Sequence, residues 1–262
     1  MKVKVSIVKV PIPASHPRRV SLTIREKLVE GLARGVVVPE GLIAHGRGEC
    51  FDYLIGEKTR SFALKAIKAA ASMLLLAEKP VISVNGNMAA LCARELAQLA
   101  NLLEAPIEVN LFYRSKSREK AVASTLKSAG ANIVLTGKPT MIPLVESLRR
   151  FVQQEGSASA DVVFVGIEDG DRVEALRRLG KAVIAVDLNP LSRSALKASI
   201  TIVDNAVRAL PKLIAEIERL RGLKRAILER RVKAYDNRRV LAEALNFMAD
   251  RLRKLAEGRL GT

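Results

Sequence analysis

Residues 80–112 read PVISVNGNMAALCARELAQLANLLEAPIEVNLF, and this stretch decides the fold. Pro80–Val84 is a short apolar run rich in β-branched residues, which predicts a buried strand. A helical pattern covers residues 88–103 and stops before Pro106, and residues 107–112 have the composition of a second strand. A strand, a helix and a strand at this spacing make a βαβ unit, in which the two strands run parallel.

Short apolar runs continue to alternate with helical patterns after this unit. The further expected strands are residues 133–135, 161–165, 182–186 and 199–203, and the further expected helices are residues 116–129, 142–154 and 172–179. Continuous apolar strands that alternate with amphipathic helices are typical of a mostly parallel sheet with helices on both faces. The sequence therefore predicts a Rossmann-like α/β fold with its core in residues 79–210, and a flexible loop at residues 153–160, QQEGSASA.

The 262 residues are expected to form a single domain, in which two further parts flank this core. Residues 1–78 are an N-terminal segment that bears motifs, and we expect in it a short extended arm, a helix over residues 22–34 and an apolar helix over residues 62–77. Two lysines interrupt the apolar helix, which is also short for a membrane span, so we interpret it as buried. Residues 211–262 are expected to form C-terminal helices with a break near Tyr235.

The composition narrows the class of protein. Two isolated cysteines in 262 residues indicate a reducing compartment. The first 13 residues, MKVKVSIVKVPIP, alternate lysine with valine and lack the apolar core of a signal peptide. We therefore expect a soluble, cytoplasmic protein with no membrane segment.

The net charge of +17 is not spread evenly, and residues 221–239 hold eight Lys and Arg residues against two acidic residues. Three interpretations remain open: a nucleic-acid-binding surface, a solvated helical face, or a field that attracts polyanionic small substrates such as ATP. The absence of tryptophan and an aromatic content of 3% argue against a stacking platform for single-stranded nucleic acid.

Polar clusters follow three of the expected strands, and ligands of parallel sheets bind beyond the carboxyl ends of the strands. After the first strand, Asn85, Gly86 and Asn87 offer free backbone N–H groups and the positive end of a helix dipole, which suits a phosphate. Asparagine also caps helices for structural reasons alone. The sequence makes this segment a candidate phosphate site.

Two later strands end in clusters that suit a nucleotide. In DLNPLSRS, residues 187–194, Asp187 is placed to accept hydrogen bonds from ribose hydroxyls, and Arg193 and Ser194 to reach phosphates. The Asp-Asn pair at residues 204–205 is expected to face the same cleft and to contact an adenine edge. A lone Asp at a strand end is often a turn former, but two clusters on successive strands favour a nucleotide site. Neither a GxGxxG fingerprint nor a P-loop motif is present, so a less common arrangement would hold the nucleotide.

Residues 41–57, GLIAHGRGECFDYLIGE, gather an imidazole, a guanidinium and a carboxylate around two glycines. We expect His45 and Arg47 to emerge from a buried element into a cleft, with the glycines permitting unusual backbone angles and the close approach of a ligand. A plain surface loop is the alternative. His16 and Arg18 lie in a second polar cluster. Because the two histidines and two cysteines lack metal-ligand spacing, no metal site is predicted, and anion or substrate binding fits the histidines better.

In this order, the motifs resemble those of the archaeal 4-phosphopantoate–β-alanine ligase family, also called archaeal phosphopantothenate synthetases. The resemblance implies an ATP-dependent ligase that condenses (R)-4-phosphopantoate with β-alanine and releases AMP and diphosphate, through a pantoyl-adenylate, in coenzyme A biosynthesis. It runs from about residue 12 to the carboxyl terminus and rests on SHPR, the Arg25-Glu26-Lys27 helix, GLIAHGRGExFDYLIGE, PVISVNGN, VNLFYR, EDGDR, DLNPLSRSA and TIVDN.

The resemblance also implies site residues and partners. It favours Arg47 and His45 for catalysis, Mg²⁺ held by phosphates and water, and a homodimer in which the apolar helix of residues 62–77 supplies the partner surface. The implied ATP contacts are Arg25, Arg47, Asp187, Leu188, Asn189, Arg193, Ser194, Asn205 and Ala206. The favoured phosphopantoate contacts are Asn85, Gly86 and Asn87, with His16, Arg18 and His45 as further candidates. No nucleic-acid partner is expected. The alternatives are another nucleotide-binding enzyme of the same fold, such as a kinase or a nucleotidyltransferase, and a basic nucleic-acid-binding module.

Overall fold

The computed structural model describes residues 11–259, so the expected N-terminal arm falls mostly outside the described residues. The helices are α1 (Arg19–Ala33), α2 (Pro39–Ile55), α3 (Ser61–Leu76), α4 (Gly86–Leu102), α5 (Lys116–Ser128), α6 (Gly170–Arg178), α7 (Arg193–Lys197), α8 (Ala206–Leu220), α9 (Arg225–Lys233) and α10 (Asn237–Ala256). The strands are β1 (Pro80–Val84), β2 (Ile107–Val109), β3 (Val134–Leu135), β4 (Thr140–Met141), β5 (Phe151–Val152), β6 (Val162–Gly166), β7 (Ala182–Val186) and β8 (Ile200–Ile202). Two single turns, η1 (Leu148–Arg150) and η2 (Gln154–Ala158), flank β5.

One sheet of six parallel strands, in the order β3-β2-β1-β6-β7-β8, forms the centre of the molecule. The chain builds the sheet outward from β1 to β3, returns to the other side of β1, and continues outward from β6 to β8. This is the strand order of doubly wound nucleotide-binding sheets, and its topological switch point lies between the carboxyl ends of β1 and β6. The expected Rossmann-like, mostly parallel α/β fold is confirmed.

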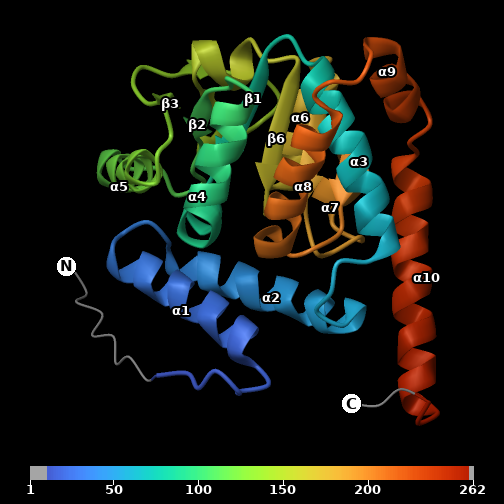
Figure 1. Ribbon diagram of the computed structural model, residues 1–262. Helices are drawn as coiled ribbons and strands as arrows, with labels where there is room; N and C mark the ends of the chain where they lie inside the picture. Colours follow the sequence, from blue (N-terminus) through green and yellow to red (C-terminus); the bar gives the residue numbers. More distant parts are fainter. Residues whose placement is uncertain (1–10, 260–262) are drawn as a thin grey trace.

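Helices lie on both faces of the sheet (Figure 1), and each face has its own hydrophobic core. Ile82, Val84 and Phe164 belong to the core formed with α3, α4 and α8. Val163 and Val165 belong to the core formed with α6. Successive residues of a strand point to opposite faces, so a strand buried on both faces is apolar throughout. This explains why the apolar runs of the sequence predicted the strands well.

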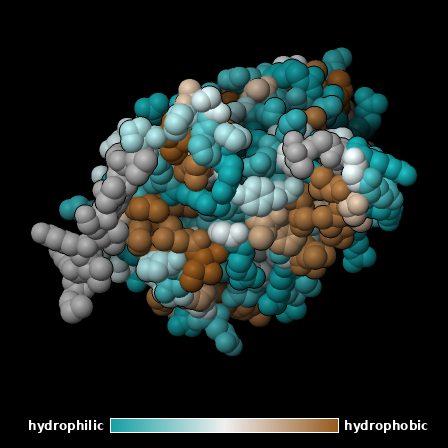
Figure 2. Space-filling model, turned by 90° about the horizontal axis from the view of Figure 1, so that it is seen from below, coloured by the Kyte–Doolittle hydropathy of each residue, from teal (hydrophilic) through white to brown (hydrophobic). Residues whose placement is uncertain are grey.

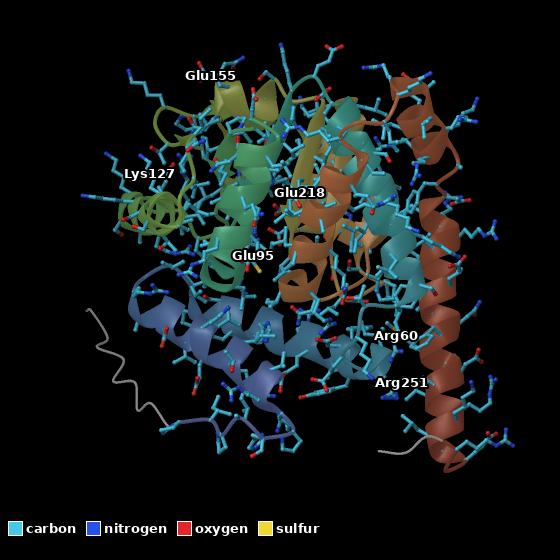
Figure 3. The ribbon with its side chains drawn as sticks, in the orientation of Figure 1. Arg60, Glu95, Lys127, Glu155, Glu218 and Arg251 are labelled. Carbon is cyan, nitrogen blue, oxygen red and sulfur yellow. The ribbon has the colours of Figure 1, made fainter. Side chains whose placement is uncertain are left out.

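The N-terminal helices close one end of the sheet. Figure 1 shows α1 and α2 lying across the end toward which the strands run, and α10 running down one side of the molecule from α9 to the end of α2. Arg60 holds this corner together: its Nε donates to the Ile55 carbonyl oxygen at 2.7 Å, and its guanidinium lies 4.7 Å from the centre of the Phe247 ring of α10. Arg60 and Arg251 are neighbours (Figure 3), and burial together with the positive charge of Arg251 lowers the pKa of Arg60.

The expected helix over residues 142–154 is wrong. The chain forms β4, η1 and β5 instead. Leu144 has a φ of 69°, which a right-handed helix does not accommodate. The Asn110 side chain also donates hydrogen bonds to the carbonyl oxygens of Arg149 and Phe151, both at 3.2 Å, so partners outside the segment use its backbone acceptors.

The flexible loop expected at residues 153–160 is also wrong. Ser157 is fully buried, and its backbone N–H and its hydroxyl both donate to the Glu108 carboxylate, at 2.8 and 2.7 Å. A Cβ at Gly156 would lie 2.3 Å from Oε2 of Glu108. The small residues of this segment therefore permit close packing around a buried carboxylate, and they do not mark a mobile loop.

Helix α3 is buried as predicted, but it offers little surface to a second copy. Its apolar face packs inside the chain against α8, α9 and α10, and its exposed side carries Leu64, Lys65 and Lys68. Little of this helix is exposed, and the expectation that it supplies the surface of a homodimer stays a prediction. Farther along the chain, α8 begins before the expected start of the C-terminal helices and continues through Pro211. The break near Tyr235, between α9 and α10, is confirmed.

Candidate active site

Two neighbouring cavities lie at the carboxyl end of the sheet. The first, the β7 cavity, has a volume of about 260 Å³ and lies between α2 and the loops that follow β6, β7 and β8. The second, the α4 cavity, has a volume of about 240 Å³ and lies between α2, the N-terminus of α4 and the segment after β2. Ala44, Ile167 and Asp169 line both, so the cavities meet where the chain leaves β6, at the topological switch point.

The β7 cavity gathers residues that are far apart in the sequence. His45 and Arg47 of α2 lie on one side, and residues that follow three strands lie on the other. The two strand-end clusters that the sequence placed in one cleft do line the same cavity. The residues named in advance for ATP that line it are Arg47, Asp187, Leu188, Asn189, Asn205 and Ala206.

The charged segment of residues 41–57 does not emerge from a buried element as a loop. It lies within α2, a helix with a proline at its start and Ile43 of the apolar lead-in 65% exposed. Gly46 and Gly48 lie inside this helix, without positive φ values, so the expectation of unusual backbone angles is wrong. A Cβ at Gly48 would lie 3.8 Å from Leu188, and Gly48 lines the cavity. The absence of side chains keeps the helix thin where it faces the cavity.

His45 and Arg47 present two different groups to the β7 cavity. The His45 ring is partly buried, and its Nε2 has no hydrogen-bond partner among the described residues. Burial lowers the pKa of His45, against the opposing effect of the Glu49 charge, so the imidazole is neutral at neutral pH. Arg47 is exposed and has no ion pair within residues 11–259. Its guanidinium is free to bind an anion.

Asp187 has the position expected of a ribose acceptor and also stabilises a turn. It accepts hydrogen bonds from the Asn189 backbone N–H at 2.9 Å and from the Ser192 hydroxyl at 2.5 Å. Burial raises the pKa of its carboxyl group, and these two bonds oppose the shift. Each carboxylate oxygen can accept a further hydrogen bond, so the turn leaves acceptor capacity toward the cavity.

An ion-pair cluster that the sequence analysis did not assign connects α2 with α8. Arg208 contacts Asp52 at 2.5 Å and Asp204 at 2.7 Å. The Asn205 amide donates to Asp52 at 3.0 Å, while its oxygen caps α8, so this side chain has little freedom to contact an adenine. Thr59 donates to the other oxygen of Asp204 at 2.6 Å. The cluster fixes α2 above the β7 cavity.

Several residues named for the site lie outside both cavities. Arg193 is paired with Glu174 at 2.6 Å, and the Ser194 hydroxyl donates to the carbonyl oxygen of Glu168. Arg25 is paired with Glu49 at 2.8 Å, and its hydrogen bond to this carboxylate raises the pKa of Arg25. His16 accepts a hydrogen bond from the backbone of Arg18, whose side chain reaches Tyr53. Ligand contacts of these five named residues, Arg193, Ser194, Arg25, His16 and Arg18, stay predictions.

In the α4 cavity, the asparagine side chains support the structure. The Asn85 amide donates to the carbonyl oxygens of Gly166 and Ile167, and its oxygen caps α4. The Asn87 amide donates to the Gly41 carbonyl oxygen at 2.7 Å. In this segment, the N-terminus of α4 is therefore the group that remains available to a ligand. Across the cavity, Arg118 donates only to backbone carbonyls, and burial together with the charge of Arg149 lowers the pKa of Arg118.

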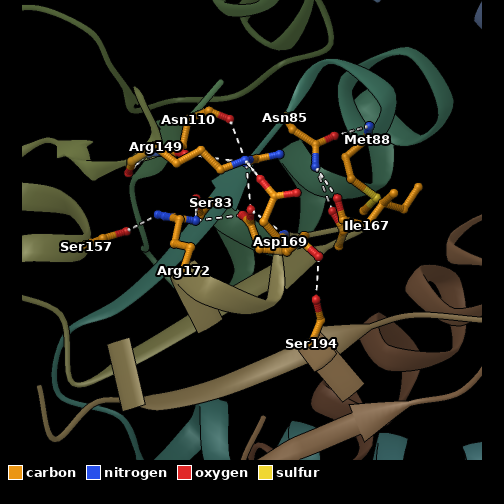
Figure 4. A network of polar contacts seen from close by, with 12 residues as sticks. Ser83, Asn85, Met88, Asn110, Arg149, Ser157, Ile167, Asp169, Arg172 and Ser194 are labelled. Atoms are coloured by element: carbon orange, nitrogen blue, oxygen red, sulfur yellow. Dashed lines mark hydrogen bonds and ion pairs between the residues drawn. The ribbon is translucent and has the colours of Figure 1, made fainter. Parts of the chain in front are cut away.

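A chain of buried ion pairs runs from the sheet to the boundary of the two cavities (Figure 4). Glu108 and Arg172 are both fully buried, and their Oε1 and Nη2 atoms are 3.1 Å apart. Arg172 also contacts Glu168 at 2.7 Å, and Glu168 contacts Arg149 at 2.8 Å. Arg149 Nε lies 2.5 Å from Asp169 Oδ2. The sequence contained a signal for this network: an acidic residue inside an apolar strand, and the run EDGDR directly after another strand.

Within the described residues, no group of three or more His, Cys, Asp and Glu side chains is arranged to hold a metal ion. Among the described helices, none combines the length and apolar character that a membrane crossing requires. Cys50 and Cys92 are both free, and burial raises the pKa of the Cys92 thiol to about 12.

Fold and cavities define a doubly wound α/β protein whose polar cleft lies at the switch point, where such folds bind nucleotides. A family model for phosphopantothenate/pantothenate synthetases matches residues 62–251. The 4-phosphopantoate–β-alanine ligase of Thermococcus onnurineus is 53% identical over 251 residues, which are 95% of this chain and 96% of the relative. The protein of the same name from Methanosarcina mazei is 46% identical over 245 residues, 94% of this chain and 97% of the relative. The chain belongs to the phosphopantothenate/pantothenate synthetase family, as predicted, and is an enzyme of the ligase class.

Proposed function

We propose that this protein joins 4-phosphopantoate to β-alanine with the consumption of ATP and the release of AMP and diphosphate, a step of coenzyme A biosynthesis. The observation that carries the proposal is the shared boundary of two polar cavities at the switch point, in a chain whose relatives are named 4-phosphopantoate–β-alanine ligase. A ligase of this kind must bring two anionic substrates together, and two adjoining cavities can each bind one substrate beside the other.

ATP is assigned to the β7 cavity. Asp187 accepts a hydrogen bond from the ribose, and the backbone at Asn205 and Ala206 presents the N-terminus of α8. Arg47 has no carboxylate partner within residues 11–259, so its guanidinium is available to two phosphate oxygens at once. Arg193 and Arg25 could reach ATP only by exchanging Glu174 and Glu49 for phosphate oxygens, and these contacts are part of the proposal.

Phosphopantoate is assigned to the α4 cavity. The N–H groups of Gly86 and Asn87 at the start of α4 and the guanidinium of Arg118 converge on this cavity, and each favours a phosphate. With the phosphate there, the carboxylate of the substrate extends toward the boundary that the α4 cavity shares with the β7 cavity. This orientation brings the carboxylate to the α-phosphate of ATP.

The reaction then requires that the substrates be held in position and that the charge on the phosphoryl oxygens be neutralised. It does not require a nucleophile from the protein. The carboxylate of phosphopantoate attacks the α-phosphate and diphosphate leaves, which gives the pantoyl-adenylate. The amine of β-alanine attacks the activated carbonyl and displaces AMP. Arg47 and the neutral imidazole of His45 lie where charge develops on the phosphoryl oxygens and can stabilise it. Mg²⁺, held by phosphates and water, is included in the proposal because it neutralises further charge.

Product analysis tests the proposal. Incubation with ATP, phosphopantoate and β-alanine should yield AMP, diphosphate and 4-phosphopantothenate in equal amounts, and omission of phosphopantoate should abolish nucleotide turnover. Formation of ADP instead would contradict the proposal and favour a kinase of the same fold.

A homodimer and a cytoplasmic location remain part of the proposal. Figure 2, which views the molecule from the α1–α2 side, shows apolar side chains among hydrophilic ones on this face, and Val20 and Ile43 are 62% and 65% exposed. This face is a further candidate, besides α3, for contact with a second copy. Light scattering should give twice the monomer mass, and an Ile43→Asp variant should give the monomer. A monomeric parent protein would contradict the proposed dimer.

A further inference from the structure

Asp169 occupies a position that no other ionisable residue of the described chain shares. It lines both the β7 cavity and the α4 cavity, and the two other residues that do so, Ala44 and Ile167, have aliphatic side chains. It follows β6 at the switch point, between the place assigned to ATP and the place assigned to phosphopantoate. An amine that attacks the activated carboxyl carbon must arrive at this boundary.

Of the other carboxylates that line the β7 cavity, Asp187 is assigned to the ribose of ATP, and Glu168 and Asp204 are paired and enclosed. Glu168 is held between Arg149 and Arg172 with its side chain 2% exposed, and Asp204 is held by Arg208 with its side chain 0% exposed. The Asp169 side chain is 39% exposed. Its Oδ2 is buried and lies 2.5 Å from Arg149 Nε, in an ion pair without hydrogen-bond geometry, and its Oδ1 accepts no hydrogen bond within residues 11–259. Asp169 is therefore a carboxylate with one fixed oxygen and one available oxygen.

Its surroundings keep Asp169 in place and tune its basicity. Arg149 is 5% exposed and is itself held by Glu168 at 2.8 Å and by the Asn110 carbonyl oxygen at 3.3 Å, so the Oδ2 anchor is rigid. Burial raises the pKa of the Asp169 carboxyl group, Arg149 opposes this, and the negative charges of Glu168 and Asp171 add to it. A carboxylate with a raised pKa is a stronger base, and an ionised one still attracts a cation.

We propose that Asp169 binds the ammonium group of β-alanine and accepts its proton during amide formation, an assignment that rests on the proposed function. One N–H bond of the ammonium breaks and its proton passes to Oδ1 of Asp169. The released lone pair forms the C–N bond at the acyl carbon. The bond from that carbon to the AMP oxygen then breaks, and AMP departs with its electron pair. The second proton lost from nitrogen passes to the phosphate of the departing AMP, so atoms and charge balance.

The test separates the two half-reactions in Asp169→Asn and in a matched control, Asp171→Asn, which removes a carboxylate two residues away that lines neither cavity. The burst of diphosphate with ATP and phosphopantoate alone reports adenylate formation, and it also reports that the site has folded. Asp169→Asn should keep this burst within about threefold and lose at least about 100-fold in kcat/KM for β-alanine, because a positioned base typically contributes that much. Asp171→Asn should keep both.

A nucleophile that is already neutral distinguishes a base from a structural residue. Hydroxylamine carries no positive charge at neutral pH, so it needs neither an ammonium site nor a base before it attacks, and the one proton that its nitrogen loses passes to the phosphate of the departing AMP. Asp169→Asn should form the hydroxamate of phosphopantoate at nearly the wild-type rate. Normal use of β-alanine by this variant, or equal loss of the burst and of the hydroxamate reaction, would overturn the assignment. A wild-type protein that releases no diphosphate would instead refute the proposed function, so the two failures are distinguishable.

Discussion

Arg208 of α8 and Asp52 of α2 form a two-pronged ion pair, with Nη2 2.5 Å from Oδ1 and Nη1 3.0 Å from Oδ2. The same guanidinium contacts Asp204 at the end of β8. Burial opposes the charge of Arg208, but its hydrogen bonds to Asp52 and the charge of Asp204 raise the pKa of Arg208 overall. A single side chain thus connects the helix that carries Arg47 to the strand ends that form the other side of the β7 cavity.

Replacement of Asp52 by alanine should weaken both folding and ATP binding. It leaves the guanidinium of Arg208 with one carboxylate in place of two, and removing one partner of a largely buried pair costs about 3 kcal/mol of unfolding free energy. Because α2 then loses its fixed position, KM for ATP should rise about tenfold. Denaturant unfolding and steady-state kinetics measure the two effects.

Lys65→Met, which breaks an exposed pair with Glu243, is the control and should change neither the unfolding free energy nor KM for ATP by much. An unchanged KM for ATP in Asp52→Ala would show that the pair does not position the site.

Arg47→Lys should lose most of the activity although the charge is retained. Lysine cannot reproduce the planar fork of donors that binds two phosphate oxygens together. Arg47 is exposed and lies outside the core, so the thermal stability of the variant should match that of the parent. Comparison of kcat/KM for ATP with the melting temperature is the measurement. Turnover close to that of the parent would mean that a diffuse positive field suffices at this position.

His45 should titrate below its ordinary value of 6.5, because burial lowers its pKa. A histidine whose folded-state pKa is depressed contributes stability that is present above the unfolded pKa and is lost as the pH falls through the folded pKa. Addition of ATP should raise the pKa of His45, since phosphate charge nearby favours the imidazolium. NMR titration of the His45 ring, assigned by its loss in His45→Gln, measures both shifts. An ATP complex without any change at His45 would place the phosphates elsewhere.

Glu108→Gln should destabilise the fold by about 3 to 5 kcal/mol, because it leaves the fully buried Arg172 short of a charge partner. Glu155→Gln is a matched control nearby: Glu155 is exposed in the same turn that Glu108 holds (Figure 3) and has no ion pair within residues 11–259. Urea unfolding of the two variants gives the comparison. Equal stabilities would mean that the buried network contributes nothing to the fold.

The sequence predicted the parallel sheet because its signal is local. Pro80–Val84 and Val162–Gly166 are buried on both faces, so each is apolar throughout and can be recognised without knowledge of its neighbours. Residues at the strand ends were then placed in one cleft by a rule of topology. The same local reasoning failed at residues 142–154, where the apolar spacing resembled a helix but Leu144 has a positive φ.

Long-range pairing explains what the sequence could not predict at the site. Glu108 and Arg172 are 64 residues apart, and no periodicity connects them. Asp52 and Arg208 are 156 residues apart, so their role in fixing α2 was not visible either. The sequence drew attention to Gly46 and Gly48, but only the structure shows that both lie in a helix and that Gly48 lines the β7 cavity. Local composition identified the residues of the cleft, and packing determined which of them are free to bind.

The fate of a labelled carboxylate oxygen tests the central claim most directly. Phosphopantoate labelled with oxygen-18 in its carboxylate is incubated with the protein, ATP and β-alanine. The masses of the products are then measured by mass spectrometry. An acyl-adenylate pathway transfers one labelled oxygen to AMP and leaves the other in the amide carbonyl of the product, so labelled AMP is the predicted result. Label in orthophosphate, with unlabelled nucleotide, would mean that an acyl phosphate forms and would contradict the assignment of an AMP-forming ligase.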